Sequence, residues 1–320
     1  MKVLVTGGGG FVGQWLARAL LERGDDVVLA GLNDRSRSPE ILQRREWDAV
    51  QWISMDMRRD ADVCAGVDAT RPDLVVHLAG ISFIPAAASA PTEAYDVNFL
   101  GAVRLLNELA RRLAAGELEP TVLVVGSATQ YGRHDPSSMP LTESAEQRPP
   151  TVYSATKAAQ EIVARQVFRA TGLRVICTRS FNHSGAGQDM SFLLPTLVKK
   201  AKEIAAGRAR PVVTLGNDTI RDYLHVTDVV RAYLMLAERG ESGEAYNVCS
   251  GSGVSARDLA ADVLQRAGTS ADISTDPALV RPTDIPVLVG SPERLMRTTG
   301  WTVARTRGDI IDDLLNAQAH

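Results

Sequence analysis

Residues 2–13 read KVLVTGGGGFVG, and this stretch decides the fold. A short apolar run passes directly into four glycines, and an amphipathic segment over 11–23 follows. A strand that enters a glycine turn and opens a helix cradles a dinucleotide pyrophosphate, because backbone N–H groups at the start of the helix face the phosphates. In the spacing GxxGxxG, Gly7 permits the tight turn, Gly10 the close approach of the pyrophosphate, and Gly13 the packing of helix on strand.

A second motif, YSATK at residues 153–157, belongs to the same chemistry. Tyr153 and Lys157 are four apart, so they share one face of a predicted helix. A free tyrosine has a pKa of about 10, and a neighbouring ammonium lowers it toward the range of a useful proton donor. Ser127 follows an apolar run, from which its hydroxyl can bond a reacting oxygen. We therefore predict that Ser127, Tyr153 and Lys157 are catalytic. The structural alternatives are a helix cap, helix packing and a solvated cation, respectively.

Short apolar runs alternate with helical patterns in the first half of the chain. Strands are expected at 3–5, 27–30, 74–78, 122–125 and 174–178, and helices at 11–23, 94–113 and 152–170. This alternation indicates a parallel sheet covered on both faces. Later, loops rich in Gly, Asp and Pro separate shorter helices expected at 193–206, 226–238 and 256–267. We therefore predict an α/β fold. A doubly wound Rossmann domain spans 1–179, and a smaller α+β substrate-binding lobe spans 180–320, with some of its segments returning to the sheet.

The end of the second predicted strand bears on the choice between NAD and NADP. An acidic residue there bonds the adenosine ribose of NAD, and this chain has Gly31 at that place. Asn33, Asp34, Arg35 and Arg37 follow, and arginines without a carboxylate suit a ribose 2′-phosphate. We expect NADP(H) to be preferred, with Asn33 and Arg35 at the cofactor. The alternative is NAD(H), with Asp34 as the ribose ligand and the arginines solvated.

Composition limits the class of protein. The 320 residues are 45% hydrophobic and carry a net charge of -3, which argues against nucleic acid or an anionic membrane as the main partner. We find no pattern of a signal peptide or a membrane span. The three cysteines lack a CxxC spacing, so we expect buried free thiols in a reducing cytoplasm. His183 and His225 are expected to form structural hydrogen bonds, and no residue cluster has the spacing of a metal site.

Taken together, the motifs resemble those of an extended short-chain dehydrogenase/reductase, over essentially the whole chain. The resemblance rests on the glycine turn, MDM at 55–57, HLAG at 77–80, Ser127 before ATQYG, and YSATK. It implies that residues 56–57 lie at the adenine and residues 78–80 at the pyrophosphate and ribose. The cofactor-binding residues expected from the turn and the resemblance are Gly7, Gly10, Phe11, Val12, Gly13, Asn33, Arg35, Asp56, Met57, Leu78, Ala79, Gly80, Tyr153 and Lys157.

The second half resembles enzymes of this family that act on GDP-sugars. FNHSGAGQ at 181–188 and LGN at 215–217, followed by RD at 221–222, resemble segments of those enzymes. RPTDIPVLVGS at 281–291 resembles reductases of GDP-4-keto-6-deoxy-D-mannose. Arginine's planar fork suits phosphate oxygens. By this resemblance, the residues that bind the sugar nucleotide are Ser127, Asn182, Asn217, Arg221 and Arg281.

Arg221 also has a structural interpretation, and Thr129 differs from the pattern of the family. Arg221 has a structural alternative as a surface salt bridge to Asp222 or Asp228. Sugar-nucleotide 4,6-dehydratases need a carboxylate two residues after the Ser/Thr, since a base must remove the C5 proton before water leaves. This chain has Thr129 there, which argues against dehydration. Comparable reductases often carry Glu at this position, so Thr129 departs from them as well.

Three functions follow, in decreasing order of support. The first is NAD(P)H-dependent reduction of the 4-keto group of a GDP-4-keto-6-deoxyhexose, giving GDP-D-rhamnose or its C4 epimer. The second is a nucleotide-sugar 4-epimerase, which generally holds NAD tightly and is disfavoured by Gly31. The third is a non-catalytic NADP(H)-binding scaffold, which the intact catalytic set disfavours. The resemblance also implies a homodimer through the helix over 94–113 and the helix that carries Tyr153.

Overall fold

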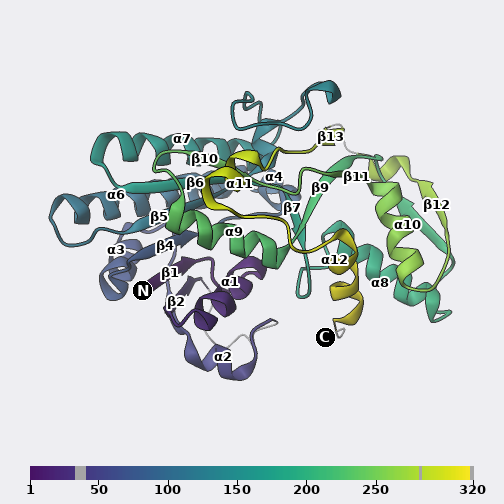
Figure 1. Cartoon of the computed structure of the whole chain (residues 1–320), viewed down its shortest axis with the longest axis horizontal. Coiled ribbons are helices and arrows are strands. Elements are labelled where there is room, and N and C mark those ends of the chain that lie inside the picture. The colour runs from purple at the N-terminus through teal and green to yellow at the C-terminus, as the bar shows by residue number, and fades with distance from the viewer. Residues whose placement is uncertain (33–40, 281–282, 318–320) are drawn as a thin grey trace.

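The computed structural model describes residues 1–32, 41–280 and 283–317. Asn33, Arg35 and Arg281, with Asp34 and Arg37, lie outside the described residues. The centre of the molecule is a parallel seven-stranded sheet in the order β10-β6-β5-β4-β1-β2-β3 (Figure 1). Its strands are β1 (Lys2–Thr6), β2 (Asp26–Gly31), β3 (Gln51–Ser54), β4 (Leu74–His77), β5 (Thr121–Ser127), β6 (Arg174–Ser180) and β10 (Ala245–Val248).

Helices cover both faces of this sheet because the strand order reverses at β1. One face is covered by α1 (Phe11–Glu22), α2 (Arg44–Ala49), α9 (Val226–Arg239) and α11 (Glu293–Thr299). The other face is covered by α3 (Asp60–Thr70), α6 (Gly101–Ala114) and α7 (Val152–Thr171). Buried leucines such as Leu16 on α1 and Leu105 on α6 fill the two layers. The predicted fold class, an α/β Rossmann sheet, is confirmed.

The predicted helix over 94–113 is helical throughout, but it is not a uniform α-helix. The chain forms α4 (Ile84–Ser89) and α5 (Pro91–Ala94), then a π-helical turn, η1 (Tyr95–Leu100), and only then α6. The wide turn directs Asn98 into the protein, where its Oδ1 accepts from Ile81 N at 2.7 Å and its Nδ2 donates to Thr156 Oγ1 at 3.0 Å. Asn98 thereby ties the loop after β4 to α7, which is consistent with the frequent occurrence of π-turns at functional sites.

A smaller lobe lies at the carboxyl end of the sheet (Figure 1). It contains the strands β7 (Asn182–Ser184), β9 (Ile220–His225), β11 (Gly253–Ser255) and β13 (Val287–Leu288) in one sheet, and β8 (Val212–Leu215) with β12 (Asp272–Thr275) in another. Its core lies between α8 (Leu193–Ala205), α10 (Ala256–Arg266) and α12 (Arg307–Asn316).

The chain passes between the lobe and the large sheet more than once. The strand β10 pairs with β6, and α9 packs against α1, although both come from the second half of the sequence. The predicted boundary between residues 179 and 180 falls within the last residues of β6. The division into two domains at that point stays a prediction.

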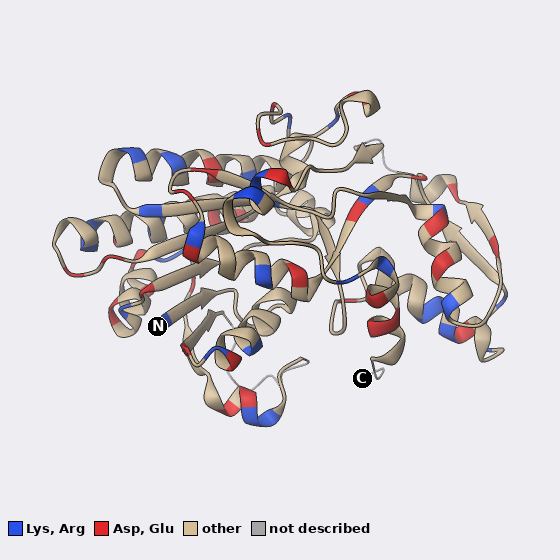
Figure 2. Cartoon of the chain, viewed as in Figure 1, with Lys and Arg blue, Asp and Glu red and all other residues tan. Residues whose placement is uncertain are grey.

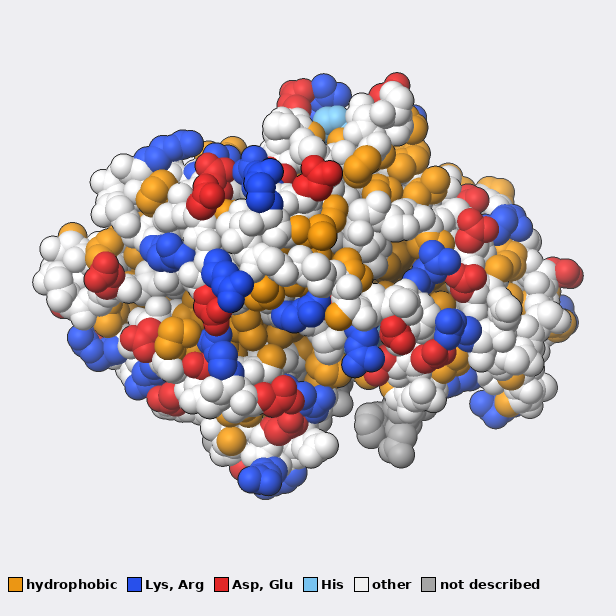
Figure 3. All heavy atoms as spheres, in the orientation of Figure 1, with side chains coloured by type: hydrophobic (Ala, Val, Ile, Leu, Met, Phe, Trp, Pro, Cys, Tyr) orange, Lys and Arg blue, Asp and Glu red, His pale blue; other side chains and the backbone are white. Residues whose placement is uncertain are grey.

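Acidic and basic residues are interspersed along the chain (Figure 2), and their side chains are interspersed over the face shown in Figure 3. No broad stripe of one sign crosses that face. Within the described residues, no helix is long and apolar enough to cross a membrane.

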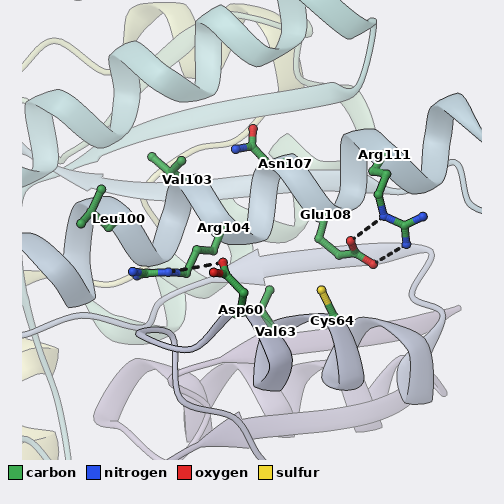
Figure 4. Close-up of a pocket in the computed structure, with 9 residues that line it drawn as sticks. All are labelled: Asp60, Val63, Cys64, Leu100, Val103, Arg104, Asn107, Glu108 and Arg111. Atoms are coloured by element: carbon green, nitrogen blue, oxygen red, sulfur yellow. Dashed lines mark hydrogen bonds and ion pairs between the residues drawn. The ribbon is translucent and has the colours of Figure 1, made fainter.

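The cysteines are free thiols, but only two of them are buried. Cys177 and Cys249 lie in the core, as expected. Cys64 is partly exposed, and the expectation of burial is wrong for it. It lines a hollow of about 390 Å³ between α3 and α6, where Glu108 reaches Arg111 at 2.8 Å (Figure 4). Its lining combines charged side chains such as Arg104 and Glu108 with apolar ones such as Val63 and Leu100.

Candidate active site

The glycine turn lies between the ends of β1 and β4. Gly7 has a φ of +70°, and a Cβ there would lie 2.8 Å from the backbone N of Ala79. A Cβ on Gly13 would lie 2.6 Å from the carbonyl oxygen of Gly8. Both positions therefore require glycine, one for its conformation and one for close packing. Gly10 is the N-cap of α1, and Phe11 and Val12 begin that helix with no acidic residue in its first turn. This helix end is suited to an anion.

The predicted segment 78–80 forms the opposite wall of the turn. His77 ends β4, is buried, and its Nδ1 lies 2.7 Å from Thr6 Oγ1 of β1. The same Thr6 hydroxyl accepts from Ala79 N at 3.3 Å. Burial, with a smaller effect of Lys157, lowers the pKa of His77 to about 3. The histidine is therefore neutral at physiological pH, and it fixes the two strand ends without adding charge.

The predicted adenine side is only partly accessible to a ligand. Asp56 follows β3 and accepts from the backbone N of Arg58 at 2.9 Å. The Arg58 side chain also bonds this carboxylate and holds its pKa below the usual value. Met57 as a whole is buried in the core, and its carbonyl oxygen accepts from Arg104 Nη1 at 3.1 Å. On the same edge, Trp52 of β3 packs against the turn: a Cβ on Gly9 would lie 3.1 Å from its ring.

Ser127 and Tyr153 are brought together by the end of β5 and the start of α7. Ser127 caps the 3-10 helix η2 (Ala128–Tyr131), and its Oγ lies 2.9 Å from Thr129 Oγ1. Tyr153 is the second residue of α7, which begins after the N-cap Thr151. Burial raises the pKa of Tyr153, and a hydrogen bond with Ser127 partly opposes the increase. The phenol is therefore protonated at neutral pH and can act as a proton donor.

Lys157 lies one helical turn beyond Tyr153, against β5 and the loop after β4. Its Nζ donates to the carbonyl oxygen of Val125 at 2.8 Å and to Gln160 Oε1 at 3.0 Å. A Cβ on Gly80 would lie 3.7 Å from the same Nζ. Burial lowers the pKa of Lys157 to about 8. The ammonium therefore lies between the tyrosine and the segment predicted to bind the cofactor.

The predicted sugar-nucleotide residues lie in the smaller lobe. Asn182 is exposed on β7, at the end nearest β6, and pairs with Tyr223 in the sheet register. The Arg221 side chain on β9 is partly buried, and its Nη1 donates to the carbonyl oxygen of Ile220. Asn217 donates to Asp284 at 2.9 Å. Burial lowers the pKa of Arg221 from its ordinary value.

The salt-bridge alternative for Arg221 is not found in the described part of the chain. Asp222 accepts from the backbone N of Ser250 at 2.7 Å, and Asp228 pairs with Arg231 at 2.7 Å. Both carboxylates are therefore engaged elsewhere. The side chain of Arg221 is held within the lobe without one of these partners, as expected of a group kept for a ligand.

The two histidines of this lobe have structural contacts. His183 Nδ1 lies 2.9 Å from the carbonyl oxygen of Phe181, and its ring stacks on Phe11 at 6.4 Å. His225 caps α9 through Thr227 and lies 3.3 Å from Asp313. The stack of His183 on Phe11 holds the lobe against the first turn of α1. Among the residues that the structure describes, no group of three His, Cys, Asp or Glu side chains could hold a metal ion.

Sequence reasoning missed the buried polar residues that surround the site. Four of them are Asn98, Gln130, Gln160 and Glu161, all almost fully buried. Gln160 and Glu161 follow Lys157 at helical spacing, so they could have been identified as continuing its face. Gln130 and Asn98 had only a weak signal, a polar residue within an otherwise apolar stretch.

Comparison with known proteins identifies the family. A family profile described as GDP-mannose 4,6 dehydratase matches residues 4–314. The chain belongs to this family, a branch of the extended short-chain dehydrogenases/reductases.

Individual relatives agree with the predicted chemistry. The chain is 35% identical over 247 residues to GDP-6-deoxy-D-mannose reductase of Pseudomonas aeruginosa, covering 76% of this chain and 80% of the relative. It is 28% identical to GDP-6-deoxy-D-talose 4-dehydrogenase of Aggregatibacter actinomycetemcomitans, covering 94% and 92%. The structure of RMD from Pseudomonas aeruginosa with NADPH matches with a TM-score of 0.81, at 28% identity and 98% coverage of both chains. UDP-glucose 4-epimerase of Thermus thermophilus with NAD matches with a TM-score of 0.84, at 25% identity, covering 99% of this chain and 100% of that chain. The predicted class, an NAD(P)-dependent oxidoreductase, is confirmed.

Proposed function

We propose that this protein reduces the C4 keto group of a GDP-4-keto-6-deoxyhexose with NADPH, giving GDP-D-rhamnose or its C4 epimer. The observation that carries the proposal is the placement of Ser127 at the end of β5 and Tyr153 at the start of α7, with Lys157 one helical turn away beside the glycine-rich cofactor site. The names of two relatives support the substrate class, since both refer to GDP-linked 6-deoxyhexoses and one to position 4.

The proposed reaction divides the work among three side chains. NADPH supplies the hydride. Tyr153 donates its phenol proton to the C4 oxygen, and the Ser127 hydroxyl bonds the same oxygen. The Lys157 ammonium stabilises the phenolate that remains. Two of its N–H groups bond Val125 and Gln160, which leaves a third for a ribose hydroxyl of the cofactor.

Thr129 favours reduction over dehydration. Its hydroxyl lies 2.9 Å from Ser127 Oγ, at the position where a dehydratase needs a carboxylate. A threonine hydroxyl cannot remove a C5 proton at neutral pH, whereas it can orient the neighbouring serine. In this proposal Thr129 therefore supports Ser127 and takes no part in proton removal.

Asn182, Asn217, Arg221 and Arg281 are proposed to bind the sugar nucleotide. Asn182 is exposed, and the partly buried guanidinium of Arg221 forms no salt bridge with Asp222 or Asp228; both observations support this role. Asn217 would act together with Asp284, to which it donates. We expect Arg221→Ala to raise KM for the GDP-sugar at least tenfold and to leave KM for NADPH within about twofold. An equal rise in both constants would contradict the assignment.

We propose NADP(H) as the preferred cofactor. Gly31 places no carboxylate at the end of β2, and the similar RMD structure contains NADPH. The similar Thermus epimerase contains NAD, so NAD(H) is the alternative. Asn33 and Arg35 remain the proposed contacts with the adenosine phosphate.

The most direct test is turnover of purified protein with a panel of 4-keto sugar nucleotides, NADPH and NADH, with products identified by NMR. The proposal requires reduction at C4 of a GDP-linked 6-deoxy sugar. Preference for a UDP- or dTDP-linked substrate would overturn the nucleotide assignment. Absence of reduction with every substrate, together with NADPH binding, would favour the non-catalytic scaffold.

A second candidate function is a nucleotide-sugar 4-epimerase, because the chain also resembles UDP-glucose 4-epimerases along nearly its whole length. An epimerase would oxidise and then reduce C4 with the same three side chains. Such an enzyme keeps its cofactor bound between turnovers. Protein that is purified with stoichiometric NAD and interconverts C4 epimers without added NADPH would favour this function.

We also propose a cytoplasmic homodimer. The free thiols of Cys177 and Cys249 suit a reducing compartment. Leu100 of η1 and Ile162 of α7 are exposed by 41% and 65% on the face that the predicted dimer would bury. Cell fractionation and light scattering would test location and assembly separately.

A further inference from the structure

We propose that Gln130, Glu161 and Arg179 form a positioning network that fixes the spacing between Ser127 and Tyr153. This inference rests on the proposed reductase function, because it assumes that Ser127 and Tyr153 act on one substrate oxygen. The three residues come from η2, α7 and β6, which converge behind the catalytic groups. They act through Ser127 and Tyr153 and are not themselves proposed to contact substrate.

The first link of the network is to the backbone of Ser127. Ser127 N donates to Gln130 Oε1 at 2.7 Å, and Gln130 is fully buried. A Cβ on Gly126 would lie 2.5 Å from the same Oε1. Glycine at 126 therefore leaves the space through which the amide of Gln130 reaches the Ser127 backbone.

The second link joins Gln130 to the helix that carries the other catalytic groups. Gln130 Nε2 donates to Glu161 Oε2 at 3.0 Å. Glu161 follows Tyr153 by eight residues and Lys157 by four, so all three lie along one side of α7. One side chain therefore connects the Ser127 backbone to the Tyr153 helix.

The third link holds the Glu161 carboxylate in a single orientation. Arg179 of β6 donates to both of its oxygens, from Nε at 2.9 Å and from Nη2 at 2.7 Å. Arg179 also donates to Tyr131 Oη at 2.9 Å and to the carbonyl oxygen of Glu143 at 3.0 Å. Burial alone would raise the pKa of Glu161, but Arg179 brings it below its ordinary value. The carboxylate therefore remains charged, and its two-point contact with a planar guanidinium fixes its direction.

The consequence for catalysis is geometric. Proton donation and oxyanion stabilisation require the Tyr153 phenol and the Ser127 hydroxyl to meet the same oxygen within hydrogen-bond distance. A displacement of about 1 Å between such groups can cost on the order of a hundredfold in rate. The network connects β5 to α7 next to the two groups, through buried amide and carboxylate contacts that have few alternative arrangements.

Gln147 offers a matched control. Gln147 Nε2 donates to Glu161 Oε1 at 3.0 Å, so it contacts the same carboxylate as Gln130. Gln147 Oε1 also accepts from Gln130 Nε2 at 3.3 Å, whereas the bond from Ser127 N is to Gln130. Gln130→Met and Gln147→Met each remove one amide from Glu161, but only the first frees the Ser127 backbone.

We expect Gln130→Met to lower kcat about tenfold to a hundredfold, with both KM values within about threefold of the wild type. Without Gln130, Ser127 is free to move away from Tyr153. Because the contact with Ser127 lowers the pKa of Tyr153, its loss should also move the alkaline limb of the pH profile of kcat to higher pH. Gln147→Met should leave kcat and the pH profile close to wild type. Equal kcat losses in the two variants, or an unshifted pH profile in Gln130→Met, would overturn the proposal.

A measurement independent of turnover separates this inference from the proposed function. Hydrogen exchange at the Ser127 amide should accelerate in Gln130→Met and stay slow in Gln147→Met, with similar melting temperatures. If Gln130→Met does not fold, Glu161→Gln provides the second variant, and Gln130→Glu in the Glu161→Gln background should restore part of kcat by returning a carboxylate to the network. Fast Ser127 exchange in the wild type would overturn the network. Full activity of Tyr153→Phe would instead overturn the proposed function.

Discussion

Trp52 occupies the space beside Gly31 in which a side chain at the end of β2 would lie. A Cβ on Gly31 would be 3.0 Å from Cη2 and 3.1 Å from Cζ2 of the indole. Trp52 is in turn packed against Trp47, with ring centroids 5.8 Å apart. The indole of Trp52 therefore leaves no room for a carboxylate at residue 31. A change of cofactor preference has to involve both Gly31 and Trp52.

The first prediction concerns this pair. The sequence alone suggests that Gly31→Asp turns the enzyme toward NADH, but the structure indicates that Asp at residue 31 requires the indole to move. We expect Gly31→Asp alone to weaken binding of both cofactors. Gly31→Asp with Trp52→Val should bind NADH more tightly than NADPH, and Trp52→Val is the control. Cofactor fluorescence titration measures all three, and a clean NADH preference in Gly31→Asp alone would contradict the role of Trp52.

The same titration tests Arg35 and Arg37. A charge-assisted hydrogen bond to a 2′-phosphate contributes about 1.5–3 kcal/mol. Changing both arginines to Ala should therefore reduce the preference for NADPH by roughly tenfold to a hundredfold. If the wild type prefers NADH and the double variant leaves the ratio unchanged, Asp34 is the ribose ligand.

The second prediction is that Tyr153→Phe lowers kcat by about 10²–10⁴-fold, the usual value of general acid catalysis. Binding of NADPH should stay close to that of the wild type, because the phenol hydroxyl is the only group removed. Tyr246→Phe is the control: it removes a hydroxyl that accepts from Glu241 N at 2.9 Å in another part of the sheet. A Tyr153→Phe enzyme with more than half of its activity would exclude Tyr153 as the proton donor.

The third prediction concerns pH. The pKa of Lys157 is about 8 in the folded protein, against about 10.4 for an unperturbed lysine. The unfolded chain therefore binds this proton more tightly, so the burial penalty is present below pH 8 and is relieved as pH rises toward about 10. NADPH should bind less tightly above pH 8, where the ammonium loses its charge. Lys157→Met should bind weakly without this pH dependence, and an identical slope in both proteins would assign the effect to another group.

The fourth prediction is that Ile162→Glu converts the proposed dimer to a monomer. Ile162 is 65% exposed on α7, and a buried charge at a subunit interface is costly. Met296→Glu on α11 is the control, because Met296 is 40% exposed on the opposite face of the sheet. Light scattering at micromolar concentration would show a dimer for the wild type and Met296→Glu. A monomeric wild type would remove the dimer from the proposal.

The sequence predicts the cofactor turn and the YxxxK helix because both depend on residues that are close in the chain. Gly7 has a positive φ, and Gly13 makes a close backbone contact. Both requirements are met within a few residues of the chain, so they appear in the sequence as the glycine spacing GxxGxxG. The strands of the buried centre were predictable for the same reason, since β1, β4 and β5 are continuous apolar runs.

The rest depends on partners that are far apart in the sequence. The edge strand β3 is half exposed and α3 has only a weak amphipathic pattern, so neither left a clear signal. Asn98 interrupts an apolar stripe, but its π-turn follows from its contacts with Ile81 and Thr156. The pairing of Glu161 with Arg179 likewise requires knowing that α7 lies over β6. Such buried polar contacts are set by tertiary packing, which no local pattern records.

The position of β10 at the edge of the central sheet affects how the chain folds while it is being synthesised on the ribosome. The strand β6 is complete at Ser180, but its outer neighbour is residues 245–248. During synthesis, the hydrogen-bonding edge of β6 therefore stays open while the whole intervening segment is translated. An open strand edge is a site of aggregation. We expect nascent chains arrested before residue 245 to depend on chaperones, and chains arrested soon after α9 and β10 have emerged to be released from that dependence.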